Sequence, residues 1–123
     1  MRLTPLAGSY ALLRLDPWSP LPEWLSDEPF FSITRTVDEL SIVCPDECVP
    51  ASVAAERGWR ALKVDGPLDL ALPGILVSLA SPLADAKIPI FAISTYDTDY
   101  LLVRNATFEA ACATLERAGH SID

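Results

Sequence analysis

The chain has 123 residues, of which half are hydrophobic, and a formal net charge of −8. This length suits one ordinary domain or two very small units that share a core. Seventeen Asp and Glu oppose nine Lys and Arg, and the sequence has no basic cluster that could neutralise phosphates, so we expect no nucleic acid partner.

Membrane insertion is not expected either. The apolar runs fall far short of the ~20 residues that span a bilayer, and the first five residues do not begin a signal-peptide pattern. We therefore expect a cytoplasmic protein with no membrane partner. The mean hydropathy of +0.28 is high for a soluble chain of this size. It predicts that some apolar surface meets another subunit, in a homodimer or a higher homo-oligomer.

The first half of the chain favours short elements. Residues 9–15 are bulky and apolar and predict a strand that ends at Asp16 and Pro17. Closely spaced prolines then leave room only for a helical turn at residues 22–25. Residues 30–36 and 40–44 predict a hairpin.

The middle of the chain predicts a short helix and a strand. Pro50 suits the first position of a helix, and Gly58 suits the position just after its end, so we expect a helix over residues 50–57. Residues 59–64 have strand character, and residues 65–67 form a turn.

The second half begins with a helix from Pro73. Apolar residues recur there at helical spacing: Ile75, Leu76, Leu79 and Leu83. Pro82 lies inside this pattern, where it cannot donate to the Ser78 carbonyl. We therefore expect a kink or a break near Ser81.

A hairpin, a helix and a short strand follow. Residues 88–96 and 99–104 predict the two strands of the hairpin. Asn105 or Thr107 can cap the next helix, and Arg117 with Gly119 indicates its end. Its apolar stripe consists of Phe108, Ala111, Cys112 and Leu115. Residues 120–122 can add a final strand.

Both halves thus follow the order strand, helix, strand, strand, helix, strand. This order is that of the ferredoxin-like unit. The expected fold class is α/β in the α+β sense, with antiparallel sheets and helices packed on one face. We place the first unit at residues 1–58 and the second at 59–123. The strand at 59–64 can serve as the last strand of the first unit or the first strand of the second, and the sequence leaves this open.

The cysteines do not form a recognisable metal motif. Cys44 and Cys48 have the spacing C-x3-C, Cys112 lies far from them, and the single histidine is His120. A zinc site needs about four N or S ligands, so we expect no metal. Cys44 and Cys112 are read as small buried apolar residues, and Cys48, in a polar turn, as the most reactive thiol.

No pattern indicates catalysis. The chain contains neither a phosphate-binding glycine loop nor a G-x-S-x-G motif, and its single histidine, His120, lies in no recognised nucleophile motif. We therefore expect no enzyme activity, no catalytic residue and no cofactor.

The predicted topology brings polar groups together at one end of the second sheet. The helix that follows Pro73 starts where the strand 88–96 ends, and the hairpin turn lies there too. A helix start favours an anion, and the glycine at 74 permits close approach to the backbone. Aspartates at 97 and 99 favour an ammonium. A free amino acid carries both charges.

Two stretches of sequence resemble a known family. GILxSLxxPLA followed by IPIFAISTYDTDYLLV resembles the core of the ACT domain, the small-molecule-sensing module of amino-acid metabolism. SITRTVDELSIVCP is similar to the N-terminal half of short bacterial proteins built from two ACT-like halves. That group also resembles the ACT repeats of aspartate kinase and of the animal arginine sensor upstream of growth signalling.

The resemblance implies a fold and a function. The fold would be two tandem ferredoxin-like ACT units. The function would be regulatory amino-acid binding without catalysis, with output through a separate effector protein. ACT domains bind amino acids at this kind of location, often across a dimer interface. On this resemblance the ligand-binding residues are Gly74, Ile75, Leu76, Ser94, Thr95, Tyr96, Asp97 and Asp99.

Each of these residues also has an ordinary structural explanation. Asp97 and Asp99 flank a turn, where aspartate is common because its side chain bonds the nearby backbone. Ser94 and Thr95 could satisfy groups at a sheet edge, and Gly74 could simply begin a helix. The alternative to an amino-acid sensor is therefore a structural or interaction module that has lost its ligand, and a small enzyme ranks third.

Overall fold

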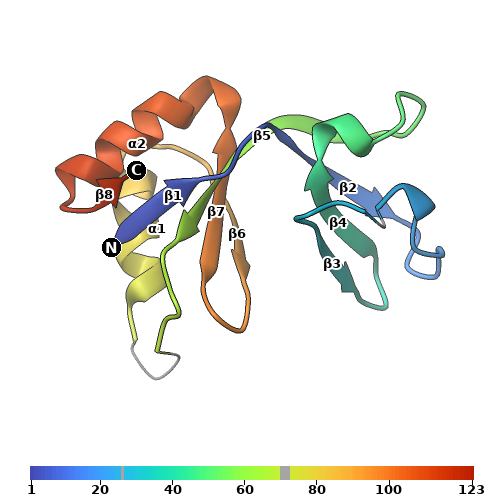
Figure 1. The fold of residues 1–123 in the computed structure, drawn as a ribbon, viewed down its shortest axis with the longest axis horizontal. Helices are drawn as coiled ribbons and strands as arrows, with labels where there is room; N and C mark the ends of the chain where they lie inside the picture. The colour runs from blue at the N-terminus through green and yellow to red at the C-terminus, as the bar shows by residue number, and fades with distance from the viewer. Residues whose placement is uncertain (26, 70–72) are drawn as a thin grey trace. The chain divides into compact units, whose positions relative to one another are not determined.

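The computed structural model describes residues 1–25, 27–69 and 73–123. The chain divides into two compact units, one made of residues 1–7 and 60–123 and the other of residues 8–59 (Figure 1). The described residues form eight strands and two α-helices, in a mixed α+β fold, as the sequence predicts. Apart from β1, an additional strand in the larger unit, the order of elements in each unit is strand, helix or helical turn, strand, strand, helix or helical turn, strand.

The smaller unit is a four-stranded sheet with single helical turns in place of helices. Its strands follow the order β3-β4-β2-β5 across the sheet, as in a ferredoxin-like unit. The elements are β2 (Tyr10–Leu15), η1 (Glu23–Leu25), β3 (Ser32–Arg35), β4 (Leu40–Pro45), η2 (Asp46–Cys48) and the first residues of β5 (Glu56–Val64). The predicted strand at 9–15, helical turn at 22–25 and hairpin are thus confirmed.

One face of this sheet carries the core of the smaller unit. Alternate residues of β2 and β4 point to that face, because side chains alternate along a strand. Leu25 from η1 and Val49 from the segment after η2 cover them. The buried cluster consists of Ala11, Leu13, Leu25, Leu40, Ile42, Cys44 and Val49.

The prediction of a helix over residues 50–57 is wrong. None of residues 50–55 is helical, residues 51–53 form a turn and a bend, and β5 already begins at Glu56. Gly58, with φ +80°, lies inside the strand at an irregularity in the pairing of β2 with β5. An isolated helix of this length is marginal. Pairing with the open edge of β2 satisfies the backbone instead, so the non-local partner determines the structure.

The larger unit contains both α-helices and the larger of the two hydrophobic cores. Its strands follow the order β6-β7-β5-β1-β8. The elements are β1 (Arg2–Pro5), the later residues of β5, α1 (Ile75–Asp85), β6 (Phe91–Ser94), β7 (Asp99–Arg104), η3 (Asn105–Thr107), α2 (Phe108–Arg117) and β8 (Ser121–Ile122). The predicted helices, hairpin and final strand of this half are confirmed.

The strand β5 belongs to both units. It pairs with β2 at Tyr10 and Trp59 in the smaller unit, and with β1 at Leu3 and Val64 in the larger unit. It is therefore the last strand of the first ferredoxin-like order and the first strand of the second, which the sequence left open.

The strand β1 is inserted between β5 and β8. Leu3 pairs with Val64 antiparallel and with Ile122 parallel, so β1 and β8 form a parallel pair beside antiparallel neighbours. The sequence predicts neither this strand nor its partners. It assigns residues 1–7 to the first unit, whereas their contacts group them with residues 60–123.

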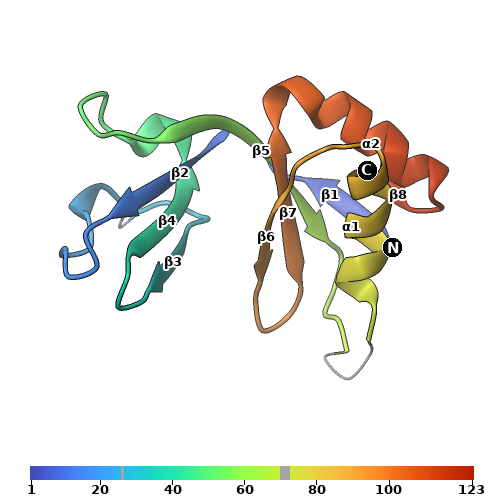
Figure 2. The same ribbon diagram turned by 180° about the vertical axis from the view of Figure 1, so that it is seen from behind.

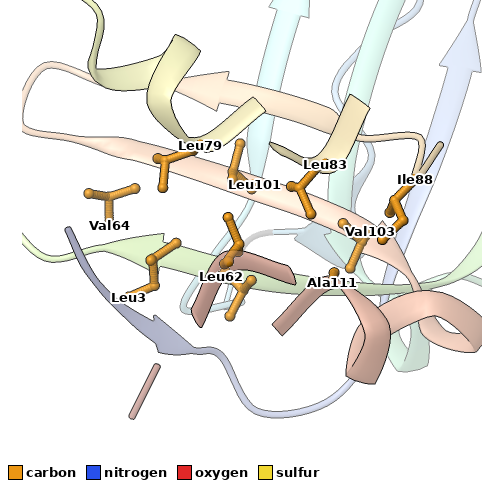
Figure 3. Close-up of a cluster of buried hydrophobic side chains, with 10 residues drawn as sticks. Leu3, Leu62, Val64, Leu79, Leu83, Ile88, Leu101, Val103 and Ala111 are labelled. Carbon is orange, nitrogen blue, oxygen red and sulfur yellow. The ribbon is translucent and has the colours of Figure 1, made fainter. Parts of the chain in front are cut away.

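Both helices cover one face of the larger sheet (Figure 2). Leucines of α1 and apolar residues of α2 pack on side chains of β1, β5 and β7. Figure 3 shows most of this cluster, which consists of Leu3, Leu62, Val64, Leu79, Leu83, Ile88, Leu101, Val103, Ala111 and Leu115. The packing of helices on one face is as predicted, and it fixes the start of α1 against the sheet.

The break expected near Ser81 does not occur. α1 continues through Pro82 to Asp85. Pro82 has no N–H for the Ser78 carbonyl, and the side chain of His120 binds that carbonyl instead, with Nε2 3.0 Å from the oxygen. A donor from outside the helix thus replaces the one that proline removes.

Candidate functional site

A cavity of about 250 Å³ lies in the larger unit, at the end where α1 begins. Figures 1 and 2 show that the turn between β6 and β7 reaches the same end of this unit as the start of α1. The described residues that line the cavity are Leu68, Asp69, Gly74, Ile75, Leu76, Ser94, Thr95, Thr98 and Asp99. The helix start, the hydroxyls of Ser94 and Thr95 and the carboxylate of Asp99 thus meet at one cavity, whereas Asp97 is not among its lining residues.

The helix start contributes backbone groups to this cavity. Gly74 is the N-cap of α1, with φ +82°, and its carbonyl accepts the Ser78 N–H at 2.9 Å. This left-handed conformation suits glycine, and a Cβ at Gly74 would meet nothing within 4 Å. The N-cap makes no side-chain hydrogen bond. The backbone N–H groups of a first helical turn have no partner within their helix, so they favour an anion.

The hairpin contributes hydroxyls and a carboxylate. The Ser94 hydroxyl donates to Asp99 Oδ1 at 2.7 Å across the end of the β6–β7 pair. The Thr95 N–H donates to the Thr98 carbonyl at 2.8 Å, and the Thr98 N–H donates to the Thr95 hydroxyl at 3.2 Å. These bonds close the turn and hold Asp99 where it lines the cavity.

The turn is tied to the segment that follows β5. The hydroxyl of Thr98, which is 4% exposed, donates to the Val64 carbonyl at 2.5 Å. The Leu68 N–H donates to the Asp97 carbonyl at 2.7 Å. A Cβ on Gly66 would lie 3.1 Å from that same carbonyl oxygen, which is tighter than an ordinary van der Waals contact. These contacts bring Leu68 and Asp69 to the cavity.

Six of the eight predicted site residues line this cavity: Gly74, Ile75, Leu76, Ser94, Thr95 and Asp99. Tyr96 and Asp97 are not among its lining residues. Tyr96 is 85% exposed, and the backbone carbonyl of Asp97 accepts a hydrogen bond from the Leu68 N–H. Whether any of these residues binds a ligand stays a prediction.

Sequence reasoning missed Leu68, Asp69 and Thr98 as lining residues. Thr98 had a local signal, because Thr95 and Thr98 stand at the two ends of the hairpin turn and hydroxyls there bond the turn backbone. Leu68 and Asp69 had no such local signal in the sequence. Their position depends on a bond between residues far apart in sequence, from Leu68 to Asp97.

The thiols of the chain are poorly ionised. Burial raises the pKa of Cys44 to about 12, and burial also raises the pKa of Cys48 and of Cys112. A raised pKa lowers the fraction of thiolate, which is the nucleophilic form. Within residues 1–25, 27–69 and 73–123, no group of three or more His, Cys, Asp and Glu could hold a metal ion. In the same part of the chain, no helix has the length and apolar character that crossing a membrane requires.

Comparison with known proteins identifies two matching family models. A model of the ACT domain matches residues 54–117. A second model, for an N-terminal domain, matches residues 8–52. The two matches together cover most of both halves of the chain.

Among curated proteins, the cytosolic arginine sensor for mTORC1 subunit 1 of Bos taurus is 31% identical over 99 residues, which is 72% of this chain and 30% of the sensor. The human sensor of the same name is 30% identical over 97 residues, with 70% of this chain and 30% of the sensor covered. The chain thus spans about a third of the length of these relatives.

Solved structures share the fold over nearly the whole chain. A crystal structure of an Agobacterium tumefaciens protein is 43% identical, with a TM-score of 0.93, and the match covers 99% of this chain and 91% of that one. The regulatory subunit of aspartate kinase from Thermus thermophilus is 11% identical, with a TM-score of 0.65, covering 95% and 96% of the two chains. The second likeness shows the fold alone. Because the ACT domain model matches more than half of the residues of this chain, the chain belongs to the ACT domain family.

Proposed function

We propose that the chain is a regulatory protein that binds a free amino acid, or a closely similar metabolite, in the cavity at the start of α1. The observation that carries this proposal is the lining of the cavity. It combines a helix start, three hydroxyls, two carboxylates and three apolar side chains. Its volume of about 250 Å³ is below the range of ~300–1,000 Å³ typical of drug-sized ligands, so it suits a small one.

The charges of the lining match the two ends of an amino acid. The first turn of α1 favours the α-carboxylate, since the helix dipole and free N–H groups face it. Asp99 accepts a hydrogen bond from Ser94 through Oδ1, and its carboxylate favours the α-ammonium. The ligand-binding set is then Gly74, Ile75, Leu76, Ser94, Thr95 and Asp99, joined by Leu68, Asp69 and Thr98.

The relatives support a sensing role. The mammalian relatives are named as arginine sensors, and the regulatory subunit of aspartate kinase shares the fold. We therefore propose a non-catalytic protein in the cytoplasm, organised as two ACT-like units that divide near residue 58. We further propose that it acts allosterically as a homodimer or higher oligomer and passes the bound state to a separate effector protein.

Thermal denaturation against each of the protein amino acids tests the binding proposal. A ligand at a hundredfold excess over its dissociation constant should stabilise the fold by about 2.7 kcal/mol, which raises the melting temperature by several degrees. Isothermal calorimetry then gives the affinity. If no amino acid shifts the melting temperature, the alternative of an interaction module that has lost its ligand replaces this proposal.

A further inference from the structure

An exposed tryptophan lies at one end of the smaller unit. Trp18, in the loop after β2, is 74% exposed, and Val37, in the turn between β3 and β4, is 78% exposed. Scattered apolar side chains are ordinary on protein surfaces, so exposure alone has no functional meaning. The surroundings of these two residues distinguish them.

Two arginines tie the loop and the turn to the sheet at the same place. Arg35, at the end of β3, donates to the Pro17 carbonyl and, at 2.9 Å, to the Ser19 carbonyl. Arg14 of β2 donates to the Asp38 carbonyl at 3.0 Å. Figures 1 and 2 show the loop after β2 and the β3–β4 turn at one end of the smaller unit. We call residues 16–21 and 36–39 the tip.

The backbone around Trp18 is held in place without burying the indole. The Trp18 N–H donates to Asp16 Oδ1 at 3.1 Å, and the Ser19 N–H donates to the Asp16 carbonyl at 3.0 Å. Arg35 binds the carbonyls on both sides of Trp18. A partner would therefore meet an already ordered turn, which lowers the entropy cost of binding. Tryptophan is also enriched among the residues that dominate binding energy.

The smaller unit carries most of the negative charge of the chain. Residues 8–59 contain nine Asp and Glu, three Arg and no Lys, which gives a net charge of −6 out of −8. All three arginines donate to backbone carbonyls. Arg57 bonds those of Asp46, Val49 and Pro50, and the other two bond carbonyls of the tip. Two of these nine carboxylates, those of Asp16 and Asp38, are exposed in the tip.

We propose that the tip is a docking surface for a basic amphipathic segment of another protein. Apolar side chains of that segment would cover Trp18 and Val37, and its Lys and Arg would meet the surrounding carboxylates. A second copy of this chain is disfavoured, because two units that each carry a net charge of −6 repel. Anionic lipid and nucleic acid are disfavoured for the same reason.

This inference goes beyond ligand binding and does not require it. The tip belongs to residues 8–59, whereas the cavity lies within the larger unit. Binding at the tip can therefore be present in a protein that responds to no amino acid, and the two proposals can fail separately.

A random peptide library displayed on phage tests the inference. Panning is done against the full chain, with depletion on the Trp18→Ser variant. We expect enriched peptides with net positive charge and interspersed apolar residues. Their affinity should fall at least tenfold for Trp18→Ser and for Val37→Ser, and it should weaken as salt rises. The matched control is Val77→Ser on α1, a residue 66% exposed in the other unit, which should leave the affinity unchanged.

Three results would overturn the inference. They are the absence of enriched peptides, enrichment of neutral or acidic ones, and equal binding to wild type and Trp18→Ser. Light scattering of both proteins adds a fourth, because a change of oligomeric state in Trp18→Ser would make a second copy the occupant. Trp18→Ser should melt within about 2 °C of wild type, since exposed substitutions are nearly neutral. If the Trp18→Ser variant unfolds, Val37→Ser provides the same comparison of peptide binding with wild type.

Discussion

His120 Nε2 lies 3.0 Å from the carbonyl oxygen of Ser78, the group that Pro82 leaves without a helical donor. Because a carbonyl can only accept, Nε2 carries the proton in this contact. Nδ1 then accepts from the Met1 amino group at 2.9 Å. Ser78 in turn bonds Gly74 and Ile75, which line the cavity. The histidine thus stabilises the helix turn that borders the candidate site.

Replacing His120 by alanine should lower the free energy of unfolding by about 1 kcal/mol, the usual net value of one hydrogen bond. In a Pro82→Ala background, residue 82 regains an N–H for the Ser78 carbonyl, so the same replacement should cost less than half as much. Urea denaturation of the four proteins gives this coupling directly. Equal costs in both backgrounds would show that His120 acts through another contact.

Asp99→Asn should weaken the binding of an amino acid by about one to two decades, since a hydrogen bond to a charged group is worth about 1.5–3 kcal/mol. Asparagine keeps an oxygen that can accept from Ser94, so the stability of the unliganded protein should change little. Calorimetry measures the affinity, and Asp97→Asn, outside the cavity lining, is the matched control. An intact ligand response with a weakened free protein would make Asp99 a structural turn residue.

Thr98→Val should destabilise the fold by about 1–3 kcal/mol, because it removes the buried donor to the Val64 carbonyl at nearly constant volume. Thr107→Val serves as control. The Thr107 hydroxyl donates to the Arg104 carbonyl at 3.2 Å in an exposed position, where water can replace it, so this change should cost under about 0.5 kcal/mol. Similar costs for both variants in urea denaturation would contradict a special role for Thr98.

Stability should fall at alkaline pH through Cys44. Burial raises the pKa of this thiol from 9.0 to about 12. As pH rises, the Cys44 thiol therefore loses its proton in the unfolded chain before it does so in the folded one. Its contribution to the free energy of unfolding is fully present below pH 9 and is lost as pH rises towards 12. Urea midpoints measured across this range should decline less steeply for Cys44→Val, which has no thiol to ionise. Parallel curves for the two proteins would assign the decline to other groups.

Cys48→Ser should leave both the fold and any ligand response unchanged. The Cys48 thiol donates to the Pro45 carbonyl at 3.1 Å, and a serine hydroxyl can make the same bond. The residue lies in the smaller unit, away from the cavity lining. Melting temperatures with and without ligand are the measurement, and a metal released by the substitution would also contradict the expectation.

The second half of the chain was largely predictable because its signals are local. Ile75, Leu79 and Leu83 repeat at helical spacing, and the YDTD turn separates two apolar strands. Once these elements are in a ferredoxin-like order, the helix start and the hairpin turn must share one end of the sheet. That geometry is why six predicted residues line a common cavity.

The predictions that failed concern residues whose structure depends on partners far away in the sequence. Glu56 and Arg57 read as the end of a helix because Gly58 suits the position just after it, yet this segment pairs with β2. β1 gave no strand signal, and its partners lie about sixty and one hundred and twenty residues further along the chain. Leu68 and Asp69 reach the cavity through a bond to the Asp97 carbonyl. Pairing partners at such distances leave no periodicity in the sequence.

The insertion of β1 between β5 and β8 also constrains the order in which a growing chain can fold. Residues 8–59 are contiguous, so the smaller unit can complete its sheet soon after β5 is synthesised. The larger unit cannot. β1 precedes all of the smaller unit, and one of its two neighbours, β8, comes only at Ser121–Ile122. Closing so long a loop is entropically costly and slow. β8 can therefore join the larger sheet only after every other described strand has been synthesised, and it pairs there with β1, the first of them.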